Sequence, residues 1–414
     1  VSTAYSEVRR LHCVRHDGSL HDFSYLTEVN PYILSAYAND FFETLFLGIE
    51  SGLSVVQNNR SRIQTYLAHD IDAPARGNVM RGIDGNGQGT VYFANQNRYW
   101  YALDLSTGFL DTMQVFDERT GRPVRFRNCM DIQLDGRGHL WGISVHANGQ
   151  GLLHRYHLEW CTNRTFTFPH PFVAFTQSND GKLWLICQPE NEKGYLVSFD
   201  PQAARFDIFR DKEGRNPLKN STPFYIIEGQ NDLLWIGTDN GLYAIDRQRA
   251  EVQTFRPQPD NQSSIGLSSN TIYVIHQDST GKLWLGTNNG LNILDPKTQE
   301  VRTLDKRNGM ASNTVYGILP DGRGNYWITT FYGLSYYEPA KNQFRNFYAE
   351  DGLSNDEFNR FSFYHDTTQH RFYFGGVNGI NAFTAQDLLV NDPPPPVVLT
   401  KLTRYNSRKD TLIE

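Results

Sequence analysis

The chain contains two closely similar segments, LWIGTDNGL at residues 234–242 and LWLGTNNGL at residues 283–291. In each segment an apolar run around a tryptophan leads into a polar turn that ends in Asn-Gly. Asn and Gly tolerate the positive φ angles of a type I′ turn, so they favour a tight connection between two strands. Each segment therefore predicts an antiparallel hairpin.

The same pattern recurs along almost the whole chain of 414 residues. Weaker copies are YWITTFYGL at residues 326–334 and FYFGGVNGI at residues 372–380, and less regular copies lie upstream. One aromatic residue marks each of eight repeats, at intervals of 43 to 51 residues, and five of the seven tryptophans fall in this register. The marker residues are Phe46, Tyr92, Trp141, Trp184, Trp235, Trp284, Trp327 and Tyr373. An interval of this length is typical of propeller blades and other repeat arrays.

Each repeat predicts four short strands. In the sixth repeat, apolar and β-branched segments occupy residues 271–276, 282–287, 291–294 and 300–304, with turn residues between them. No repeat contains a stretch of helical periodicity, and a single four-stranded sheet cannot bury both of its faces. The sequence therefore predicts an all-β fold, a β-propeller of seven or eight four-stranded blades.

The two ends of the chain divide it into three predicted parts. Residues 1–30 contain two strands, at 8–16 and 19–25, and the eighth repeat lacks an outer strand after residues 379–383. Because closure removes exposed strand edges, we expect residues 8–25 to pair with residues 379–383 and close one ring. The alternative is that residues 1–30 finish a blade of a preceding propeller.

The predicted propeller occupies residues 31–392, and residues 393–414 follow it as a separate part. Four prolines at 393–396 form a stiff spacer, and residues 397–405 alternate like the first strand of a further β domain. The chain begins with Val1 and shows no signal peptide, so we expect it to be a mature or truncated piece of a longer protein.

Composition excludes several classes of function. Lys and Arg number 39 and Asp and Glu number 45, a net charge of −6, whereas a nucleic-acid binder needs a basic surface. No run of 18 apolar residues is present to cross a membrane. The four cysteines lie far apart, and no His, Cys or carboxylate cluster has metal-ligand spacing. We expect no metal, no cofactor and no catalytic residues.

Two recurring residue types are predicted to be structural. The Asp-x-x-Gly turns resemble calcium-binding motifs, but a residue that recurs in most repeats is better explained as a cap of its own hairpin. The tryptophans in register are expected to pack between blades rather than to bind ligand. The turn residues are Asp84, Asp135, Asp180, Asp278 and Asp321.

The candidate binding residues lie where the repeat fails. The short hairpin between the second and third strands is replaced by longer polar and aromatic loops in the second, third, fourth and seventh repeats. Such loops on one rim suit a small polar ligand, with amides, Arg and His for hydroxyl groups and aromatic rings for stacking. Ordinary loop variability is the alternative. The candidates are Asn97, Arg98, Trp100, His146, Asn148, Gln188, Phe331 and Tyr332, with Arg360 at the start of the eighth repeat.

The consensus Asp-x-x-Gly-x-Leu-Trp-x-Gly-Thr-x-x-Gly-Leu, with DGLSN at residues 351–355, resembles the two-component regulator propeller repeats. Residues 393–405 resemble the start of the Ig-like triple-tyrosine domain that follows such propellers. The resemblance implies the periplasmic sensor region of a membrane-anchored hybrid two-component system of Bacteroidota type. It also implies a carbohydrate or related nutrient as ligand, and a homodimer formed through the triple-tyrosine domain in the full protein.

Two other classes of function stay open from the sequence. A catalytic propeller, such as a polysaccharide lyase or glycosidase, would need a carboxylate pair or a His/Tyr/Arg cluster at the channel mouth. A protein–protein scaffold would present a broad apolar patch on the rim. The absence of kinase and receiver segments in these residues makes the sensing part of a receptor the leading hypothesis.

Overall fold

The computed structural model describes side chains for residues 62–68, 78–97, 99–189, 194–257 and 266–389. It describes some further strands by backbone alone, within residues 12–57 and 404–413. The chain divides into two compact units, Val1–Gln64 and Thr65–Glu414.

The larger unit contains seven four-stranded antiparallel blades, of which blade 2 has one additional short strand, so the seven-blade alternative is the one observed. In each blade the strands lie in chain order from the axis outward, except that the outer strand of blade 7 and the additional strand of blade 2 come from upstream.

The strands of blades 1 to 4 have the following bounds. Blade 1 is β7 (Met80–Gly85), β8 (Thr90–Asn95), β9 (Trp100–Asp104) and β10 (Leu110–Thr112). Blade 2 is β12 (Cys129–Leu134), β13 (His139–Val145), β14 (Gly151–His157) and β15 (Thr162–Phe168), with β11 (Phe116–Asp117) parallel to β15. Blade 3 is β16 (Phe172–Gln177), β17 (Leu183–Cys187), β18 (Tyr195–Asp200) and β19 (Arg205–Ile208). Blade 4 is β20 (Pro223–Glu228), β21 (Leu233–Thr238), β22 (Gly241–Asp246) and β23 (Glu251–Phe255).

Blades 5 to 7 and the short helices complete this unit. Blade 5 is β24 (Ile272–Gln277), β25 (Leu283–Thr287), β26 (Gly290–Leu294) and β27 (Val301–Leu304). Blade 6 is β28 (Val315–Pro320), β29 (Tyr326–Thr330), β30 (Leu334–Glu338) and β31 (Gln343–Phe347). Blade 7 is β32 (Phe358–Asp366), β33 (Arg371–Gly376), β34 (Ile380–Thr384) and β6 (Gln64–Tyr66). Helix α2 (Ala385–Leu389) follows blade 7, and 3₁₀ turns lie at Gln230–Asp232, Lys306–Asn308 and Ala349–Asp351.

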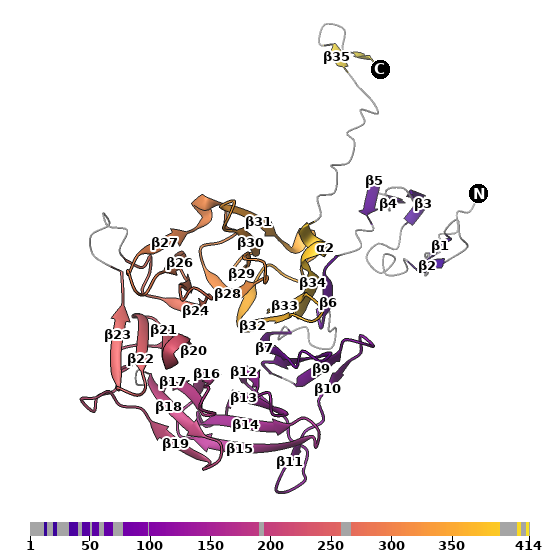
Figure 1. The fold of residues 1–414 in the computed structure, drawn as a ribbon. Coiled ribbons are helices and arrows are strands. Elements are labelled where there is room, and N and C mark those ends of the chain that lie inside the picture. Colours follow the sequence, from indigo (N-terminus) through magenta and orange to yellow (C-terminus); the bar gives the residue numbers. More distant parts are fainter. Residues whose placement is uncertain are drawn as a thin grey trace. The chain divides into compact units, whose positions relative to one another are not determined.

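The seven blades form a closed ring (Figure 1). The innermost strands β7, β12, β16, β20, β24, β28 and β32 each contact the next, and β32 contacts β7. Asn359 of β32 donates from Nδ2 to the Met80 carbonyl of β7 at 3.0 Å, and the Gly379 amide donates to the Asn78 carbonyl at 2.9 Å. Hydrogen bonds therefore join the last blade to the first.

The prediction that residues 8–25 pair with residues 379–383 is wrong. The neighbours of β34 are β33 and β6, so both of its edges are occupied. Strand β6 lies directly upstream of blade 1 in the sequence, and a short separation along the chain keeps the entropy cost of this closure low. The described parts of residues 8–25, β1 (His12–Val14) and β2 (Leu20–Asp22), pair with each other, and the rest lie outside the described residues.

The first predicted repeat does not contribute a blade to the ring. Its strands β3 (Ile33–Asn39), β4 (Thr44–Ile49) and β5 (Gly52–Gln57) form a separate three-stranded antiparallel sheet, which belongs to the smaller unit. At the other end of the chain, β35 (Arg404–Asn406) and β36 (Thr411–Ile413) form a hairpin. Most of the strand predicted at residues 397–405 lies outside the described residues.

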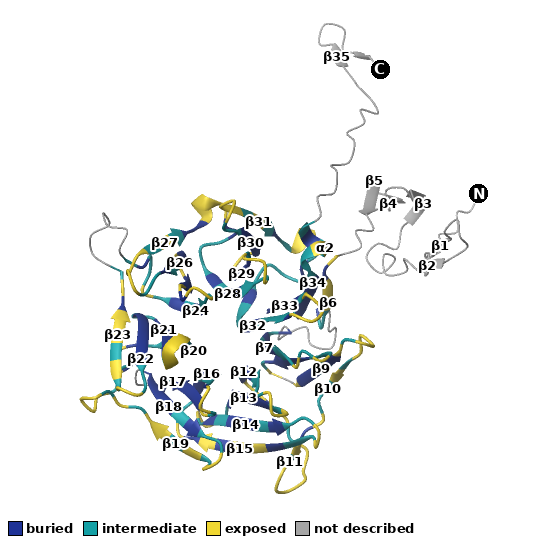
Figure 2. Ribbon diagram, viewed as in Figure 1, coloured by how far each residue is buried: buried dark blue, intermediate teal, exposed yellow. Residues whose placement is uncertain are grey.

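The recurring tryptophans form the core between blades, as predicted. The five side chains retain at most 7% of their exposure, and Figure 2 shows buried residues along the inner and middle strands. Trp284 of blade 5 stacks on Tyr326 of blade 6 with ring centroids 3.8 Å apart. Its indole Nε1 donates to Asp278 at 3.0 Å. Stacking between blades gives each sheet the apolar cover that it lacks alone.

The Asp-x-x-Gly turns are structural, with one correction. Asp278 accepts hydrogen bonds from the amides of Thr280 and Lys282 at 2.9 and 3.1 Å and so caps its own hairpin. Asp84 does not cap its hairpin, because Asn86 occupies that position and accepts from the amides of residues 88 and 90. The Asp84 carboxylate instead reaches the Leu134 amide of blade 2 at 2.7 Å.

Candidate ligand-binding site on the ring axis

The hairpins between second and third strands lie on the same face of the ring as the beginnings of the inner strands. The amide that follows the second strand donates to the carbonyl that precedes the inner strand, from Gln96 to Val79 at 2.9 Å and from Phe331 to Thr314 at 2.9 Å. We call this side of the ring the hairpin face. The predicted rim loops and the entrance to the ring axis therefore share one face.

Most polar candidates on the rim are exposed and bond within their own loop. His146 Nδ1 lies 2.7 Å from Asn148 Oδ1, and Asn148 Nδ2 donates to Gln150 at 2.8 Å. Asn97 is exposed, and its amide donates to Asn95 Oδ1 at 3.0 Å. Such bonds hold the loops in defined conformations. Gln188 is half-buried, and Arg98 lies outside the described residues.

Trp100 is not a ligand platform. The side chain is only 1% exposed and stacks on Phe126 with centroids 3.9 Å apart. Gly142 of blade 2 leaves the space that the indole fills, because a Cβ there would lie 2.4 Å from a ring carbon. Trp100 thus packs between blades 1 and 2. The register from residue 95 to residue 100 places it in β9 rather than in the loop.

Phe331 and Tyr332 are the predicted aromatic residues that do face solvent. They are 50% and 55% exposed, and the Tyr332 ring lies 5.6 Å from that of Tyr348. They occupy the hairpin of blade 6, at the two positions that are Asn288 and Asn289 in blade 5. An aromatic surface is therefore available at this point of the rim.

A further set of side chains comes from the inner strands. In blades 1 to 6 the second residue of the inner strand is partly buried, and in all of these blades except blade 4 it lies between two buried residues. These second residues are Arg81, Met130, Val173, Phe224, Tyr273 and Tyr316. Rings of three successive blades form an arc, since Tyr273 lies 5.4 Å from both Phe224 and Tyr316 by ring centroids.

Arg360 of blade 7 reaches across this arc. Its guanidinium carbon lies 5.2 Å from the Phe224 ring centroid and 5.6 Å from that of Tyr273. Those rings belong to blades 4 and 5, which are not neighbours of blade 7. The contact therefore places the guanidinium over the axis of the ring, where an arginine and aromatic faces attract each other.

A wide bulge in β32 aims Arg360 at the axis. From Phe358 to Phe363, a step of five residues on β32 is matched by a step of only two on β33. In the inner strands of the other blades a step of two is matched by one. Phe361 takes φ 63°, a strained conformation for a bulky residue, and stacks on Tyr225 of blade 4 at 5.2 Å. Blade 7 thus departs most from the repeat at the axis.

Arg81 is the second cation in this cluster. Its Nε donates to Gln96 Oε1 in the blade 1 hairpin at 3.1 Å. Burial and the charge of Arg360 lower the pKa of Arg81, and burial lowers that of Arg360. The nearby Cys129 thiol and Tyr316 hydroxyl have raised pKa values because of burial, so both are neutral at neutral pH. We call Arg81, Arg360, Phe224, Tyr273 and Tyr316 the axial cluster.

Farther along the axis from the hairpin face, acidic side chains replace the arginines of the axial cluster. Beyond the Tyr225–Phe361 pair a cavity of about 450 Å³ is lined by Asp84, Asp131 and Tyr364, among others. Burial raises the pKa of Asp84 to about 6 and that of Asp131 well above its ordinary value. Within the described ranges no three His, Cys, Asp or Glu side chains are grouped to hold a metal.

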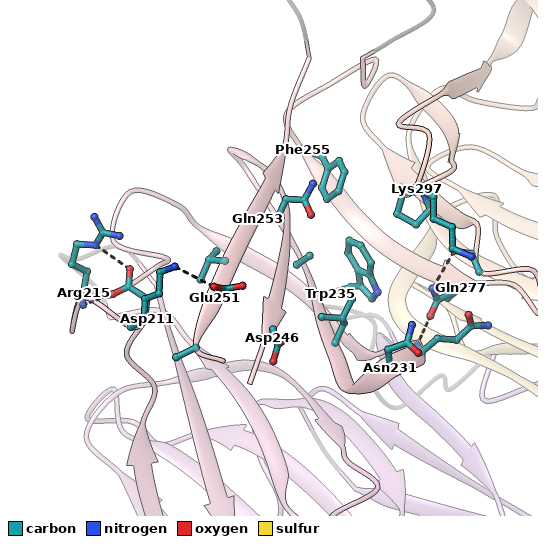
Figure 3. A pocket seen from close by; sticks show the side chains of 18 of the residues that line it. Asp211, Arg215, Asn231, Trp235, Asp246, Glu251, Gln253, Phe255, Gln277 and Lys297 are labelled. Atoms are coloured by element: carbon teal, nitrogen blue, oxygen red, sulfur yellow. Dashed lines mark hydrogen bonds and ion pairs between the residues drawn. The ribbon is translucent and has the colours of Figure 1, made fainter. Parts of the chain in front are cut away.

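A larger cavity of about 650 Å³ lies between the outer parts of blades 4 and 5 (Figure 3). Most of its charged groups are paired: Arg215 Nε donates to Asp211 at 3.0 Å and Lys212 Nζ to Glu251 at 3.1 Å. Apolar walls are supplied by Trp235 and Phe255. Because most of the acids and bases there already have partners, this cavity is a weaker binding candidate than the axial cluster.

The sequence reasoning named Arg360 but missed the other members of the axial cluster. Phe224, Tyr273 and Tyr316 look like ordinary strand aromatics when each is taken alone. Alignment of the inner strands by their alternation would have placed them, with Arg81, at one equivalent position. The unusual residue types at that position are the signal that was available.

Comparison with known proteins agrees with the fold. Residues 266–289 and 309–332 match the profile of the family described as Two component regulator propeller, so two hairpin regions carry the repeat that the sequence predicts. No curated protein matches the chain.

Two solved structures from B. thetaiotaomicron are similar over 93% of the chain. One is the extracellular domain assigned to a hybrid two component system, BT3049, with 20% identity and a TM-score of 0.67. The other is the extracellular domain assigned to a one component system, BT4673, with 17% identity and a TM-score of 0.61. The chain spans 50% and 49% of their lengths, respectively.

The WD40 propeller domain of Doa1 is also similar, with 10% identity, a TM-score of 0.55 and coverage of 75% of this chain and 94% of that one. At these identities the likeness concerns the fold. A separate search of the described residues finds no helix with the length and apolar character needed to span a bilayer.

Proposed function

We propose that this chain is a ligand-sensing region of a two-component signalling receptor, located in the periplasm, and that it detects a carbohydrate or related nutrient. The proposal is of a binding domain without catalytic turnover: the axial cluster supplies the Arg and Tyr of the catalytic alternative but no His, and burial raises the pKa of Tyr316, which disfavours it as a base. It is supported by the match of two repeats to the two-component regulator propeller family. Similarity to two extracellular domains assigned to signalling systems of B. thetaiotaomicron supports the same class.

The axial cluster is the observation that favours ligand binding over a purely structural ring. Packing requires apolar side chains at the inner strands, as Met130 provides in blade 2 and Val173 in blade 3. Blades 1, 4, 5, 6 and 7 instead place two guanidinium groups and three aromatic rings at or near the axis. Aromatic faces and hydrogen-bond donors in one partly buried cluster are the groups that hold a sugar.

Calorimetric titration of the full chain with a panel of mono- and oligosaccharides tests this function. We expect at least one glycan to bind with a saturable heat and to be recovered unchanged after prolonged incubation. Conversion of a bound glycan to product, abolished by one substitution, would instead establish the catalytic propeller. A panel with no binder would contradict carbohydrate sensing.

The homodimer through the triple-tyrosine domain is a separate part of the proposal. It concerns the full receptor and rests on the resemblance of residues 393–405 to the start of that domain. Sedimentation of the full extracellular region with and without its segment downstream of residue 392 measures it. We expect the longer protein to dimerise and the shorter one to stay monomeric.

A further inference from the structure

Two cations at the axis have no acid beside them. Among the described residues neither Arg81 nor Arg360 forms an ion pair, although eleven other basic or histidine contacts to acids are made elsewhere. One terminal nitrogen of Arg360, Nη1, is buried without a hydrogen-bond partner. The 3.0 Å hydrogen bond between Asn359 and Met80 joins the residues next to the two arginines, and the positive charge of Arg360 lowers the pKa of Arg81.

The acids nearest the axis do not fill this role. Glu357 acts on the Tyr316 hydroxyl and makes no ion pair with either arginine in the described part of the chain. Asp131 lies deeper, near Tyr225, and burial favours its neutral form. The two arginines therefore give the axis positive charge that no acid of the described residues neutralises through an ion pair, although Glu357 lies near Tyr316.

An arrangement of this kind costs stability. A buried charge without a partner is among the most unfavourable groups in a folded protein, and like charges side by side add to the cost. Strain at Phe361, which sets the position of Arg360, adds further. Because such costs are retained mainly where function requires them, the cluster suggests a missing anion.

We propose that Arg81 and Arg360 bind the anionic group of an acidic saccharide, such as a uronic acid or a sulfated sugar, on the axis of the ring. Two guanidinium groups suit a carboxylate or sulfate, which accepts several charge-assisted hydrogen bonds at once. The arc of Phe224, Tyr273 and Tyr316 offers ring faces to the C–H face of the sugar, and the tyrosine hydroxyls can bond to its hydroxyl groups. This inference rests on the proposed function, for which it specifies the ligand class.

Inorganic sulfate is the probe that tests the anion site without a known sugar. Thermal unfolding of the full chain is measured in sulfate and in chloride at equal ionic strength, for the native chain and for a variant with Arg81→Met and Arg360→Met. Arg137→Met is the surface control, because it removes one positive charge, where the double variant removes two, from an exposed hairpin away from the axis. Sulfate stabilises many proteins generally, so only the difference between variants is informative.

We expect sulfate to raise the unfolding temperature of the native chain and the Arg137→Met variant more than that of the double variant. Without sulfate we expect the double variant to be the more stable protein. Equal responses to sulfate in all three proteins overturn the anion site. A double variant that unfolds below the native chain without sulfate also contradicts it, because the arginines would then have structural partners.

Calorimetry with matched sugars then tests the ligand class. Galacturonic and galactose oligosaccharides differ in the carboxylate, and the acidic member should bind more tightly. Loss of Arg360 should weaken that binding about 30-fold, which is about 2 kcal/mol at 1.4 kcal/mol per decade. Preference for a neutral glycan, unaffected by either arginine, leaves the sensor proposal standing and refutes the acidic ligand. A sulfate effect without binding of any glycan supports the anion site and refutes carbohydrate sensing.

Discussion

Blades 5 and 7 share one sequence pattern, but their inner strands differ in backbone geometry. Blade 5 follows the repeat: it has a single-residue bulge, an Asn-Gly hairpin and a capping aspartate that also binds the tryptophan. Among described residues 266–304, no buried side-chain polar atom lacks a partner. Blade 7 has the wide bulge and the positive φ at Phe361, and its buried Arg360 Nη1, Ser362 Oγ and Tyr373 hydroxyl have no partner.

The difference teaches where this ring is optimised for stability and where it is not. Agreement between local turn chemistry, packing and polar satisfaction is what makes a repeat fold reliably. Blade 5 shows this agreement. Blade 7 departs from it near the axis, in its backbone geometry and in its unpaired buried polar atoms. We therefore expect substitutions in blade 5 to change stability and substitutions at the axis of blade 7 to change binding.

The largest effect is expected for Trp284→Ala in blade 5. The change removes the stacking on Tyr326 and the hydrogen bond to Asp278, and it leaves a cavity between two blades. The free energy of unfolding should fall by about 3–5 kcal/mol, as measured by chemical denaturation. Trp100→Ala should behave in the same way, because Trp100 is equally buried. A loss of ligand affinity with unchanged stability would contradict the assignment of either residue to the core.

A second comparison uses two aspartates of the Asp-x-x-Gly turns: Asp278, which caps its own hairpin, and Asp84, which does not. Burial raises the pKa of Asp84 to about 6, so between pH 4 and 6 the folded chain holds a proton that the unfolded chain releases. This group therefore makes the fold less stable as pH rises through that range, by up to about 3 kcal/mol. Urea unfolding of Asp84→Asn and of the native chain at both pH values tests this. The difference in the free energy of unfolding should favour the variant more at pH 7 than at pH 4.

Asp278 supplies the control of opposite sign. The pKa of Asp278 is lowered despite partial burial, through hydrogen bonds from Thr280, Trp284 and backbone amides. Its ionised form stabilises the fold above the unfolded pKa, and this contribution is lost as pH falls. Asp278→Asn should therefore lose more stability at pH 7 than at pH 4. Parallel pH profiles for the two variants would show that position in the repeat, and not environment, sets the effect.

A smaller gain in stability is expected when the charge at the axis of blade 7 is removed. Arg360→Met takes away one of two neighbouring cations and keeps a long side chain against Phe224 and Tyr273. Without ligand, the free energy of unfolding should rise by about 1 kcal/mol, the scale of many gains at functional sites. The same measurement on Arg249→Met, whose exposed side chain lies near Asp246, should show no gain.

The smallest effect is expected on the rim of blade 6. Phe331 and Tyr332 are exposed, so replacing both with alanine should change the free energy of unfolding by no more than about 0.5 kcal/mol. If the ligand is confined to the axis, its affinity should also change little in calorimetry. A large loss of affinity would extend the site from the axis to the rim.

The repeat was predictable from the sequence because the hairpin signal and the tryptophan core are local. Thr287, Asn289 and Gly290 specify the same turn wherever they recur. The prediction of a type I′ turn is wrong, because only Gly290 takes a positive φ, of 104°, and Asn289 does not. The Gly290 amide also donates to the Asn313 carbonyl at the start of the next blade, at 2.7 Å. One motif therefore determines both the hairpin and part of the contact between blades.

Ring closure and the axial cluster could not be predicted in the same way, because both depend on residues distant in the sequence. Strand β6 is a three-residue strand, too short to stand out among its neighbours. Asp84 was assigned to a cap because it lies two residues before the true capping position, occupied by Asn86. Arg81 and Arg360 meet only after the ring has closed, and no local pattern records that they lie close to each other.

Blade 7 combines strands from both ends of the ring's sequence, and this arrangement has a mechanical consequence. Its outer strand β6 is reached from upstream residues, and its third strand β34 runs into α2 and the residues beyond. Blade 7 therefore carries both covalent connections of the ring to the rest of the chain, and the other six blades carry neither. If β6 moves relative to β34, the distance changes between the point where the chain enters blade 7 and the point where it leaves. A ligand bound by Arg360 would therefore contact the blade that is covalently connected to both the upstream and the downstream segments of the chain.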